Sequence, residues 1–298
     1  MPSNLRAPRI SHASTHVGPR PSADRDLPVR GGMLPVPSAR TSVPRGGVAG
    51  VTSRLGAGML VASLVAGLHA AWGVRRMRRQ AAQVRPLVHD VDLPGRFPPR
   101  FLVMLGDSAA AGHGLVDPEE AVPRRLARAL LAADGRATAV RSVAVDGANT
   151  ADVLATQVEA ARGAEVVLLG VGANDALDPR RTREQLVADT DHLLRALREV
   201  ASKDAQLLIN TCPDLSAAPG LPAVLRPVVG WRCRRTAEVQ MAVAALHGIP
   251  VLDLPRAKLP REVFGADGFH PGAEGHAQLT ARALDLLADA APAGPAAR

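Results

Sequence analysis

The sequence predicts a three-layer α/β/α sandwich with a roughly five-stranded parallel sheet over residues 98–291. Two observations predict it: short apolar runs alternate with longer helical stretches from Arg100 onward, and most of these runs are apolar on both faces. Strands buried on both faces are typical of parallel sheets that helices cover on either side. Hydrophobic residues make up 47% of the 298-residue chain, which is enough for such a core.

Strands and helices are expected to alternate along this region. The expected strands are 101–105, 139–145, 165–171, 206–211 and 249–254. The expected helices lie near 119–133, 150–162, 182–201, 229–247 and 272–290. A strand followed by a helix and then by a parallel strand is the repeating unit of this fold class.

The N-terminal part has a different composition. Residues 1–55 are rich in Pro, Gly, Ser and Arg and are expected to be a disordered basic tail, while 75–97 reads as a basic linker and 292–298 as a short disordered tail. Between them, residues 56–74 (GAGMLVASLVAGLHAAWGV) contain no charged residue. That length is close to the roughly 20 residues that span a bilayer, so a transmembrane or signal-anchor helix is expected there.

Alternatives to a membrane anchor remain open for residues 56–74. The segment could be a buried or interfacial helix, or a cleaved signal peptide if translation starts at Met33 instead of Met1. Arginines lie on both sides of the segment, so the side of the membrane is not fixed. We therefore expect a membrane-anchored or exported protein of unassigned topology and oligomeric state.

The positive charge is confined to the N-terminal part. Residues 1–97 carry 14 Arg against four Asp, a net charge of +10, and the remainder of the chain carries a net charge of −2. Nucleic-acid binders combine positive charge with a reading element or with aromatic side chains for stacking. This chain has no Tyr, four Phe and two Trp, so nucleic acid is not an expected partner.

Three short segments follow directly on the first three expected strands. They are Gly106-Asp107-Ser108, Gly147 and Gly172-Ala173-Asn174-Asp175. The carboxyl ends of parallel strands meet at one edge of the sheet, where ligands bind in open α/β folds. A fourth segment, Asp267-Gly268-Phe269-His270, precedes the last expected helix.

Together the four segments contain the parts of a hydrolytic site. Serine needs a base to act as a nucleophile, and a spacing of three residues lets Asp267 orient His270 as the base for Ser108. The Ser108 and Gly147 backbone N–H groups and the Asn174 side-chain amide are the expected oxyanion donors. Asp107 is expected to anchor the turn by hydrogen bonds. Alone, each segment could be an ordinary turn or helix cap.

These segments, in this order, resemble the four sequence blocks of the SGNH (GDSL-type) hydrolase family, whose name letters match Ser108, Gly147, Asn174 and His270. The resemblance covers about residues 98–291. It implies a flavodoxin-like sandwich and hydrolysis of esters or thioesters with no metal and no organic cofactor. One departure is Asp146, where the family often has Asn, because a carboxylate there could weaken the oxyanion hole unless it points away.

The expected function is that of a serine esterase or lipase acting through an acyl-enzyme on Ser108, on a small-molecule or lipid ester. A carbohydrate deacetylase of the same fold, or a catalytically weak membrane-tethered protein that binds acylated ligands, are the alternatives. The absence of Gly-x-Ser-x-Gly argues against the α/β-hydrolase fold.

Residues outside the four segments are less informative. The loop after the fourth strand supplies a candidate acyl pocket from Leu215, Leu221, Val224 and Leu225, and ordinary packing is the alternative. Cys212 and Cys233 flank this loop and could form a disulfide in an exported protein. His113 could contact substrate or be structural, and His192, His247 and His276 lack metal-ligand spacing.

Overall fold

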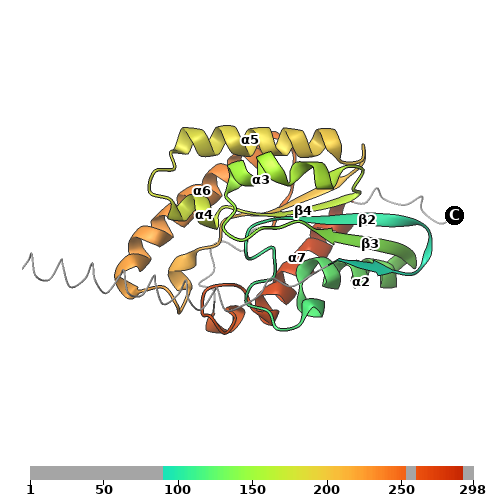
Figure 1. The fold of residues 1–298 in the computed structure, drawn as a ribbon, viewed down its shortest axis with the longest axis horizontal. Coiled ribbons are helices and arrows are strands. Elements are labelled where there is room, and N and C mark those ends of the chain that lie inside the picture. The colour runs from blue at the N-terminus through green and yellow to red at the C-terminus, as the bar shows by residue number, and fades with distance from the viewer. Residues whose placement is uncertain (1–89, 253–259, 291–298) are drawn as a thin grey trace, which may run out of the picture. The chain divides into compact units, whose positions relative to one another are not determined.

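Five parallel strands and one antiparallel edge strand make up the sheet in the computed structural model, which describes residues 90–252 and 260–290 (Figure 1). The strands are β1 (Val91–Leu93), β2 (Arg96–Gly106), β3 (Arg136–Ser142), β4 (Val166–Gly170), β5 (Gln206–Asn210) and β6 (Val251–Leu252). Their order is β1-β3-β2-β4-β5-β6. The five parallel strands thus have the flavodoxin-like order: β3 lies on one side of β2, and β4, β5 and β6 follow one another on the other side.

Helices cover both faces of the sheet. The α-helices are α2 (Val122–Asp134), α3 (Thr150–Thr156), α4 (Ala173–Leu177), α5 (Arg183–Val200), α6 (Arg226–Leu246) and α7 (Ala273–Ala290). Single 3-10 turns are η1 (Pro118–Glu120), η2 (Val158–Ala161), η3 (Leu215–Ala217), η4 (Ala223–Leu225) and η5 (Arg261–Val263). Helices α3, α5 and α6 lie on one face, and α2 and α7 on the other (Figure 1).

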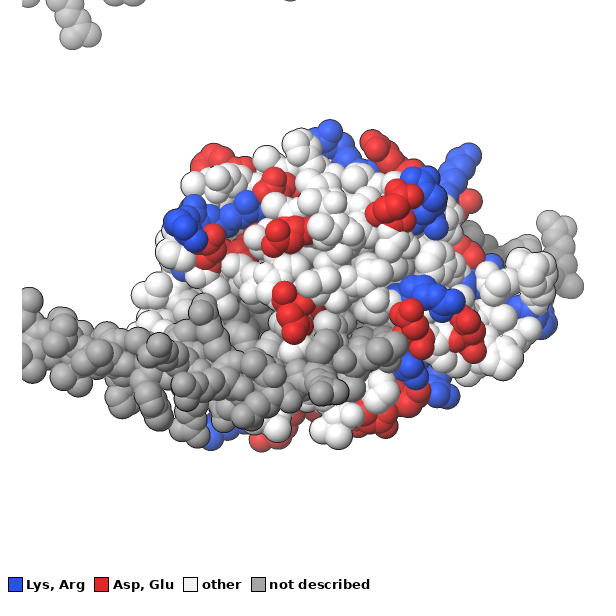
Figure 2. Space-filling view, in the orientation of Figure 1, with Lys and Arg blue, Asp and Glu red and all other residues white. Residues whose placement is uncertain are grey.

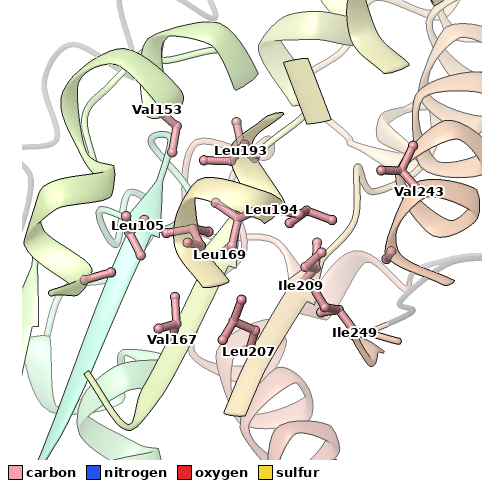
Figure 3. Close-up of a cluster of buried hydrophobic side chains, with 14 of the residues drawn as sticks. Leu105, Val153, Val167, Leu169, Leu193, Leu194, Leu207, Ile209, Val243 and Ile249 are labelled. Atoms are coloured by element: carbon pink, nitrogen blue, oxygen red, sulfur yellow. The ribbon is translucent and has the colours of Figure 1, made fainter. Parts of the chain in front are cut away.

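Two buried clusters hold these layers together. Alternate residues of β2 point to opposite faces: Val103 and Leu105 pack under α3, α5 and α6, while Leu102 and Met104 pack against α2 and α7. Figure 3 shows the first cluster, in which Leu169 and Leu207 of the sheet lie beneath the α5 leucines. Each fully buried leucine contributes about 1.5–3 kcal/mol to the free energy of folding.

Side-chain caps fix the starts of two helices, α3 and α5. The Asn149 side chain accepts hydrogen bonds from the N–H groups of Ala151 and Asp152, and the Asp152 carboxylate accepts one from the Asn149 N–H. Thr182 and Gln185 form the same reciprocal arrangement at the start of α5. The cap at Asn149 places α3 directly after Gly147, one of the expected oxyanion positions.

The sheet differs from the sequence expectation at its edges. It has six strands where about five were expected, because Val91–Leu93 pairs antiparallel with β3. Residues 91–93 and 96–97, expected to belong to the linker, are therefore part of strands β1 and β2. Strand β1 is only three residues long and its central Asp92 is exposed, so it has no apolar run to mark it. The short helix α4 was also not expected.

Several expectations fall outside the described residues. These include the tail 1–55, the membrane segment 56–74, most of the linker 75–97 and the tail 292–298. Within 90–252 and 260–290, no helix combines the length and the apolar character needed to cross a bilayer. The face of this region drawn in Figure 2 carries acidic and basic side chains side by side, in line with the small net charge of residues 98–298.

Candidate active site

The nucleophile candidate lies where β2 ends. Strand β2 ends at Gly106, and the Asp107 N–H donates to the carbonyl of Gly170, the last residue of the neighbouring strand β4. The Asp107 carboxylate accepts a hydrogen bond from the Ala109 N–H at 3.0 Å. Asp107 thus anchors the turn that presents Ser108, which is the role expected from the sequence.

Ser108, His270 and Asp267 form a continuous hydrogen-bonded chain. Ser108 Oγ lies 2.9 Å from His270 Nε2, and His270 Nδ1 lies 2.6 Å from Asp267 Oδ2. The other carboxylate oxygen, Asp267 Oδ1, accepts the backbone N–H groups of Phe269 and His270. Asp267 and His270 are both buried. The structure therefore brings together three residues that lie up to 162 positions apart in sequence.

The two buried carboxylates of the site have opposite pKa shifts. Burial acts to raise the pKa of Asp267, but the hydrogen bonds from the His270 ring and from the Phe269 and His270 N–H groups outweigh it, so this pKa is lowered. Burial raises the pKa of Asp107 to about 6, against the opposing effects of the Ala109 hydrogen bond and the His270 charge. At neutral pH Asp267 is ionised and accepts the Nδ1 proton of His270.

A tight loop holds the histidine. The Gly265 N–H donates to the His270 carbonyl at 2.8 Å, and Phe264 pairs with Pro271 across the loop. A Cβ atom on Gly265 would lie 2.4 Å from the carbonyl oxygen of Gly114, in the segment that follows the nucleophile. Glycine at 265 is therefore required for the loop to approach the Ser108 side this closely.

Two of the three expected oxyanion donors, Gly147 and Asn174, follow the strands on either side of β2. Gly147 has φ +76°, a left-handed conformation that favours glycine, in the connection from β3 to α3. Asn174 is in the first turn of α4, directly after β4, and its Nδ2 donates one hydrogen bond to the Ala148 carbonyl at 2.9 Å. A side-chain amide has two N–H donors, so the second remains for a ligand.

Asp146 faces a histidine. Its Oδ1 lies 2.7 Å from Nε2 of His113, and the two form an ion pair when His113 is protonated. The His113 ring is buried, and its centroid lies 5.2 Å from that of His270. His113 therefore has a charged neighbour, although it lies in a loop where the sequence showed no partner for it.

Three buried polar residues that tie the strand ends together were not expected from the sequence. Asp175 accepts both the N–H and the hydroxyl of Thr150, which joins the Gly147 segment to the Asn174 segment. Gln157 bonds both the N–H and the carbonyl of Gly106. Gln240 does the same between Val171 and Cys212. For Gln157 and Gln240, a glutamine among the apolar residues of an expected helix was the available signal in the sequence.

An apolar cavity opens at Ser108. Its walls come from α4, the loop after β5, η5, the His270 loop and α7, and they include Leu177, Leu215, Val263, Phe269 and Leu279. Of the four leucines and valines expected to form an acyl pocket, Leu215 lines this cavity. The expectation was wrong for the others: Leu221 and Leu225 pack in the same apolar cluster as Leu215 but do not line the cavity, and Val224 is 52% exposed.

The two cysteines are buried and free. A hydrogen bond with the Cys233 thiol and burial raise the pKa of Cys212, which packs at the end of β5. Across the residues that the structure describes, no group of three or more His, Cys, Asp or Glu side chains could hold a metal ion.

Comparisons with known proteins point to one family. The model of the GDSL-like Lipase/Acylhydrolase family matches residues 104–278. GDSL-like esterase Rv1075c of Mycobacterium tuberculosis is 32% identical over 198 residues, which are 62% of this chain and 60% of that protein. The chain thus spans about 60% of the length of this curated relative.

Solved structures with similar chains include TesA and a lipase/acylhydrolase from Enterococcus faecalis. TesA is 21% identical with a TM-score of 0.49, over 64% of this chain and 100% of TesA. The Enterococcus faecalis protein is 23% identical with a TM-score of 0.49, over 66% of this chain and 100% of that one. The matched range of the family model contains Ser108, Gly147, Asn174 and His270 and covers more than half of the sequence. The chain belongs to the GDSL-like lipase/acylhydrolase family.

Proposed function

We propose that this protein hydrolyses carboxylic esters through an acyl-enzyme formed on Ser108. The observation that carries the proposal is the chain of hydrogen bonds from Ser108 through His270 to the buried Asp267, at the wall of an apolar cavity. Family membership supports the same chemistry. The apolar wall of the cavity favours a substrate whose acyl group is a hydrocarbon chain.

In the proposed first half-reaction, Ser108 Oγ attacks the ester carbonyl while His270 Nε2 takes the hydroxyl proton. The resulting oxyanion accepts hydrogen bonds from the Ser108 and Gly147 N–H groups and from Asn174 Nδ2. His270 then gives its proton to the departing alcohol as the carbon–oxygen bond breaks. Water attacks the acyl-enzyme with His270 again as base, which releases the acid and restores Ser108.

Asp267 has two tasks in this scheme. Its Oδ2 accepts the Nδ1 proton, which fixes the tautomer that leaves Nε2 free to receive the serine proton. Its negative charge stabilises the imidazolium that forms. Because its pKa is lowered, the carboxylate stays ionised while His270 carries the proton.

The full-length protein, assayed on p-nitrophenyl acetate, butyrate, octanoate and palmitate, tests this proposal. We expect Ser108→Ala to lose at least about 1000-fold in kcat/KM, and Ser142→Ala, at the end of β3, to retain wild-type activity. A fluorophosphonate reagent should label the wild type and the Ser142 variant but not the Ser108 variant. Equal inactivity of the wild type and Ser108→Ala on every ester, with no labelling, would contradict hydrolysis and favour a binding role.

A further inference from the structure

The N-terminal half of α6 has apolar side chains on both of its faces. Val229 and Cys233 are buried on the inner face. On the outer face, Val224 in η4 and Val228 and Trp231 in α6 are 52%, 59% and 50% exposed. They follow each other at spacings of four and three residues and therefore form one stripe. We call Val224, Val228 and Trp231 the apolar ridge.

Four arginines lie in the part of α6 that carries the apolar ridge; among them Arg226 donates to the Leu221 carbonyl and Arg234 is paired with Asp214. Arg226, Arg232, Arg234 and Arg235 lie in the same stretch of α6, which has no acidic residue before Glu238. The Arg235 guanidinium stacks on the Trp231 ring, with its central carbon 4.8 Å from the ring centroid. Exposed apolar side chains that include a tryptophan and are bordered by arginines are typical of helices that lie in the headgroup region of a membrane.

A groove runs beside the ridge, between α6 and the start of α5. It is lined by Trp231 and by Arg181, Arg183, Arg232 and Arg235, with Asp175 as its acidic residue. Arg181 is paired with Asp175 and Asp189, and Arg232 donates to backbone carbonyls of the α4 segment. Arg183 and Arg235 also line the groove, near the Glu184 carboxylate, and their guanidinium groups suit the phosphate groups of anionic lipids.

The ridge adjoins one wall of the catalytic cavity. Arg232 of α6 donates to the carbonyls of Ala176 and Asp178, so α4 is fastened to the helix that carries the ridge, and the two helices lie side by side (Figure 1). Leu177 of α4 lines the cavity and is 37% exposed. A surface that receives the ridge would therefore lie close to the wall of the cavity in which Ser108 stands.

We propose that the apolar ridge and its flanking arginines dock the protein on an anionic lipid surface, from which an ester enters the catalytic cavity. The second part of this inference rests on the proposed function. A second copy of the chain fits the surface less well, because a twofold dimer through the ridge would bring the same arginines of the two copies together.

Tryptophan fluorescence tests the docking directly. The chain has two tryptophans, so the full-length Trp72→Phe variant reports on Trp231 alone. We expect its emission to shift to shorter wavelength, and to be quenched by brominated acyl chains, on vesicles of phosphatidylcholine with phosphatidylglycerol. Pure phosphatidylcholine vesicles should bind about tenfold more weakly, and Arg183→Gln with Arg235→Gln should reduce the Trp231 response to the anionic vesicles, while the arginines of residues 1–97 keep part of the preference for them.

Ridge variants and a matched control complete the experiment. In the Trp72→Phe background, Val224→Ser with Val228→Ser should weaken vesicle binding about tenfold. Leu246→Ser, at the other end of α6 and 84% exposed in the native chain, should leave it unchanged. The same ridge change should lower hydrolysis of an ester embedded in these vesicles about tenfold, and leave hydrolysis of soluble p-nitrophenyl butyrate within twofold.

The outcomes separate the two proposals. A Trp231 response to vesicles in a protein that cleaves no ester would overturn the proposed function and leave the docking surface standing. Ester hydrolysis with no Trp231 response would overturn the docking surface alone. Emission that is already at short wavelength without lipid, or a dimer in light scattering that the ridge serines dissociate, would show that another part of the chain or a second copy covers the ridge.

Discussion

The two halves of the candidate active site are built in different ways. Ser108, Gly147 and Asn174 each follow a strand, and buried side chains such as Gln157 and Asp175 tie these strand ends to one another. Asp267 and His270 lie in a loop between η5 and α7, held mainly by its own backbone bonds and by close contact with Gly114. We call these the strand-end half and the loop half.

Because of this difference, we expect mutations in the two halves to affect different properties of the protein. The strand-end half shares its residues with the hydrophobic core, so changes there should alter the free energy of unfolding. The loop half contributes few buried apolar groups, so changes there should alter catalysis more than stability. Substitutions in each half test this contrast.

Asp267→Asn should have the largest effect. Asn Oδ1 can still accept the Phe269 and His270 N–H groups, but its Nδ2 would then face His270 Nδ1 and donate to it. The Nδ1 lone pair would accept this bond, which leaves the proton on Nε2, where it cannot receive the serine proton. The same change in a serine protease triad lowers turnover about 10,000-fold, and we expect a similar loss in kcat.

Asp285→Asn, an exposed carboxylate on α7, is the control and should retain wild-type kcat. Thermal unfolding of the two variants should agree with the wild type within about 3 °C. Substantial activity in Asp267→Asn would mean that the loop half does not set the tautomer of His270, and the assignment of Asp267 would be wrong.

Gly265→Ala should displace the loop half without changing any catalytic group. The added Cβ would meet the Gly114 carbonyl oxygen at 2.4 Å, so the loop must move away from the Ser108 side. Misplacement by about 1 Å can cost about 100-fold in rate, and we expect a loss of about 10- to 100-fold in kcat/KM. The neighbouring exposed Ala266→Ser should leave kcat/KM unchanged; a matching loss there would point to general loop damage.

The two halves were predicted from different features of the sequence. The apolar runs at 101–105 and 165–171 indicate buried strands, so the positions of Ser108 and Asn174 at one edge follow from the fold class. The loop half was found from the spacing of Asp267 and His270 and from the family resemblance. The strand runs and the Asp267–His270 spacing can both be recognised because each is a pattern of a few neighbouring residues.

The remaining features depend on contacts between distant residues. Gln157 bonds Gly106 from 51 positions away, and nothing near either residue indicates the pairing. The contact of Asp146 with His113 is of the same kind. Val224 was misplaced in the acyl pocket because the apolar residues of a loop show no periodicity that would separate inward from outward positions.

Asp107→Asn tests the strand-end half through stability. Because burial raises the pKa of Asp107 from 3.8 to about 6, the native state binds this proton more tightly than the unfolded chain. The wild type should therefore lose about 3 kcal/mol of stability from this group as the pH rises from about 4 to above 6. Asn keeps an acceptor for the Ala109 N–H and carries no charge, so the variant should not show this loss.

Urea unfolding at pH 4.5 and pH 7.5 measures this difference. Asp107→Asn should be more stable than the wild type by about 1–3 kcal/mol at pH 7.5, and by less at pH 4.5. Its kcat should fall only severalfold, because the loss is the attraction of Asp107 for the His270 imidazolium. If the difference in free energy of unfolding between the variant and the wild type is the same at both pH values, ionisation of Asp107 does not destabilise the native state.

Asp146→Asn should have the smallest effect, in the opposite direction. Asp146 precedes Gly147, whose N–H is a proposed oxyanion donor, so its negative charge opposes the charge that develops on the substrate. Its contact with His113 compensates only while His113 is protonated. Asn can still pair with the His113 ring and carries no charge, so kcat should rise about two- to tenfold, as a screened charge interaction of about 1 kcal/mol would give.

A fall in kcat for Asp146→Asn would carry more information than the expected rise. Asp146 lies at the strand-end half, but its partner His113 packs beside the His270 ring, at a centroid distance of 5.2 Å. A loss that His113→Gln reproduces, and that the double variant does not deepen, would mean that this pair helps to position His270. The pair would then be a link through which the strand-end half holds the loop half in place.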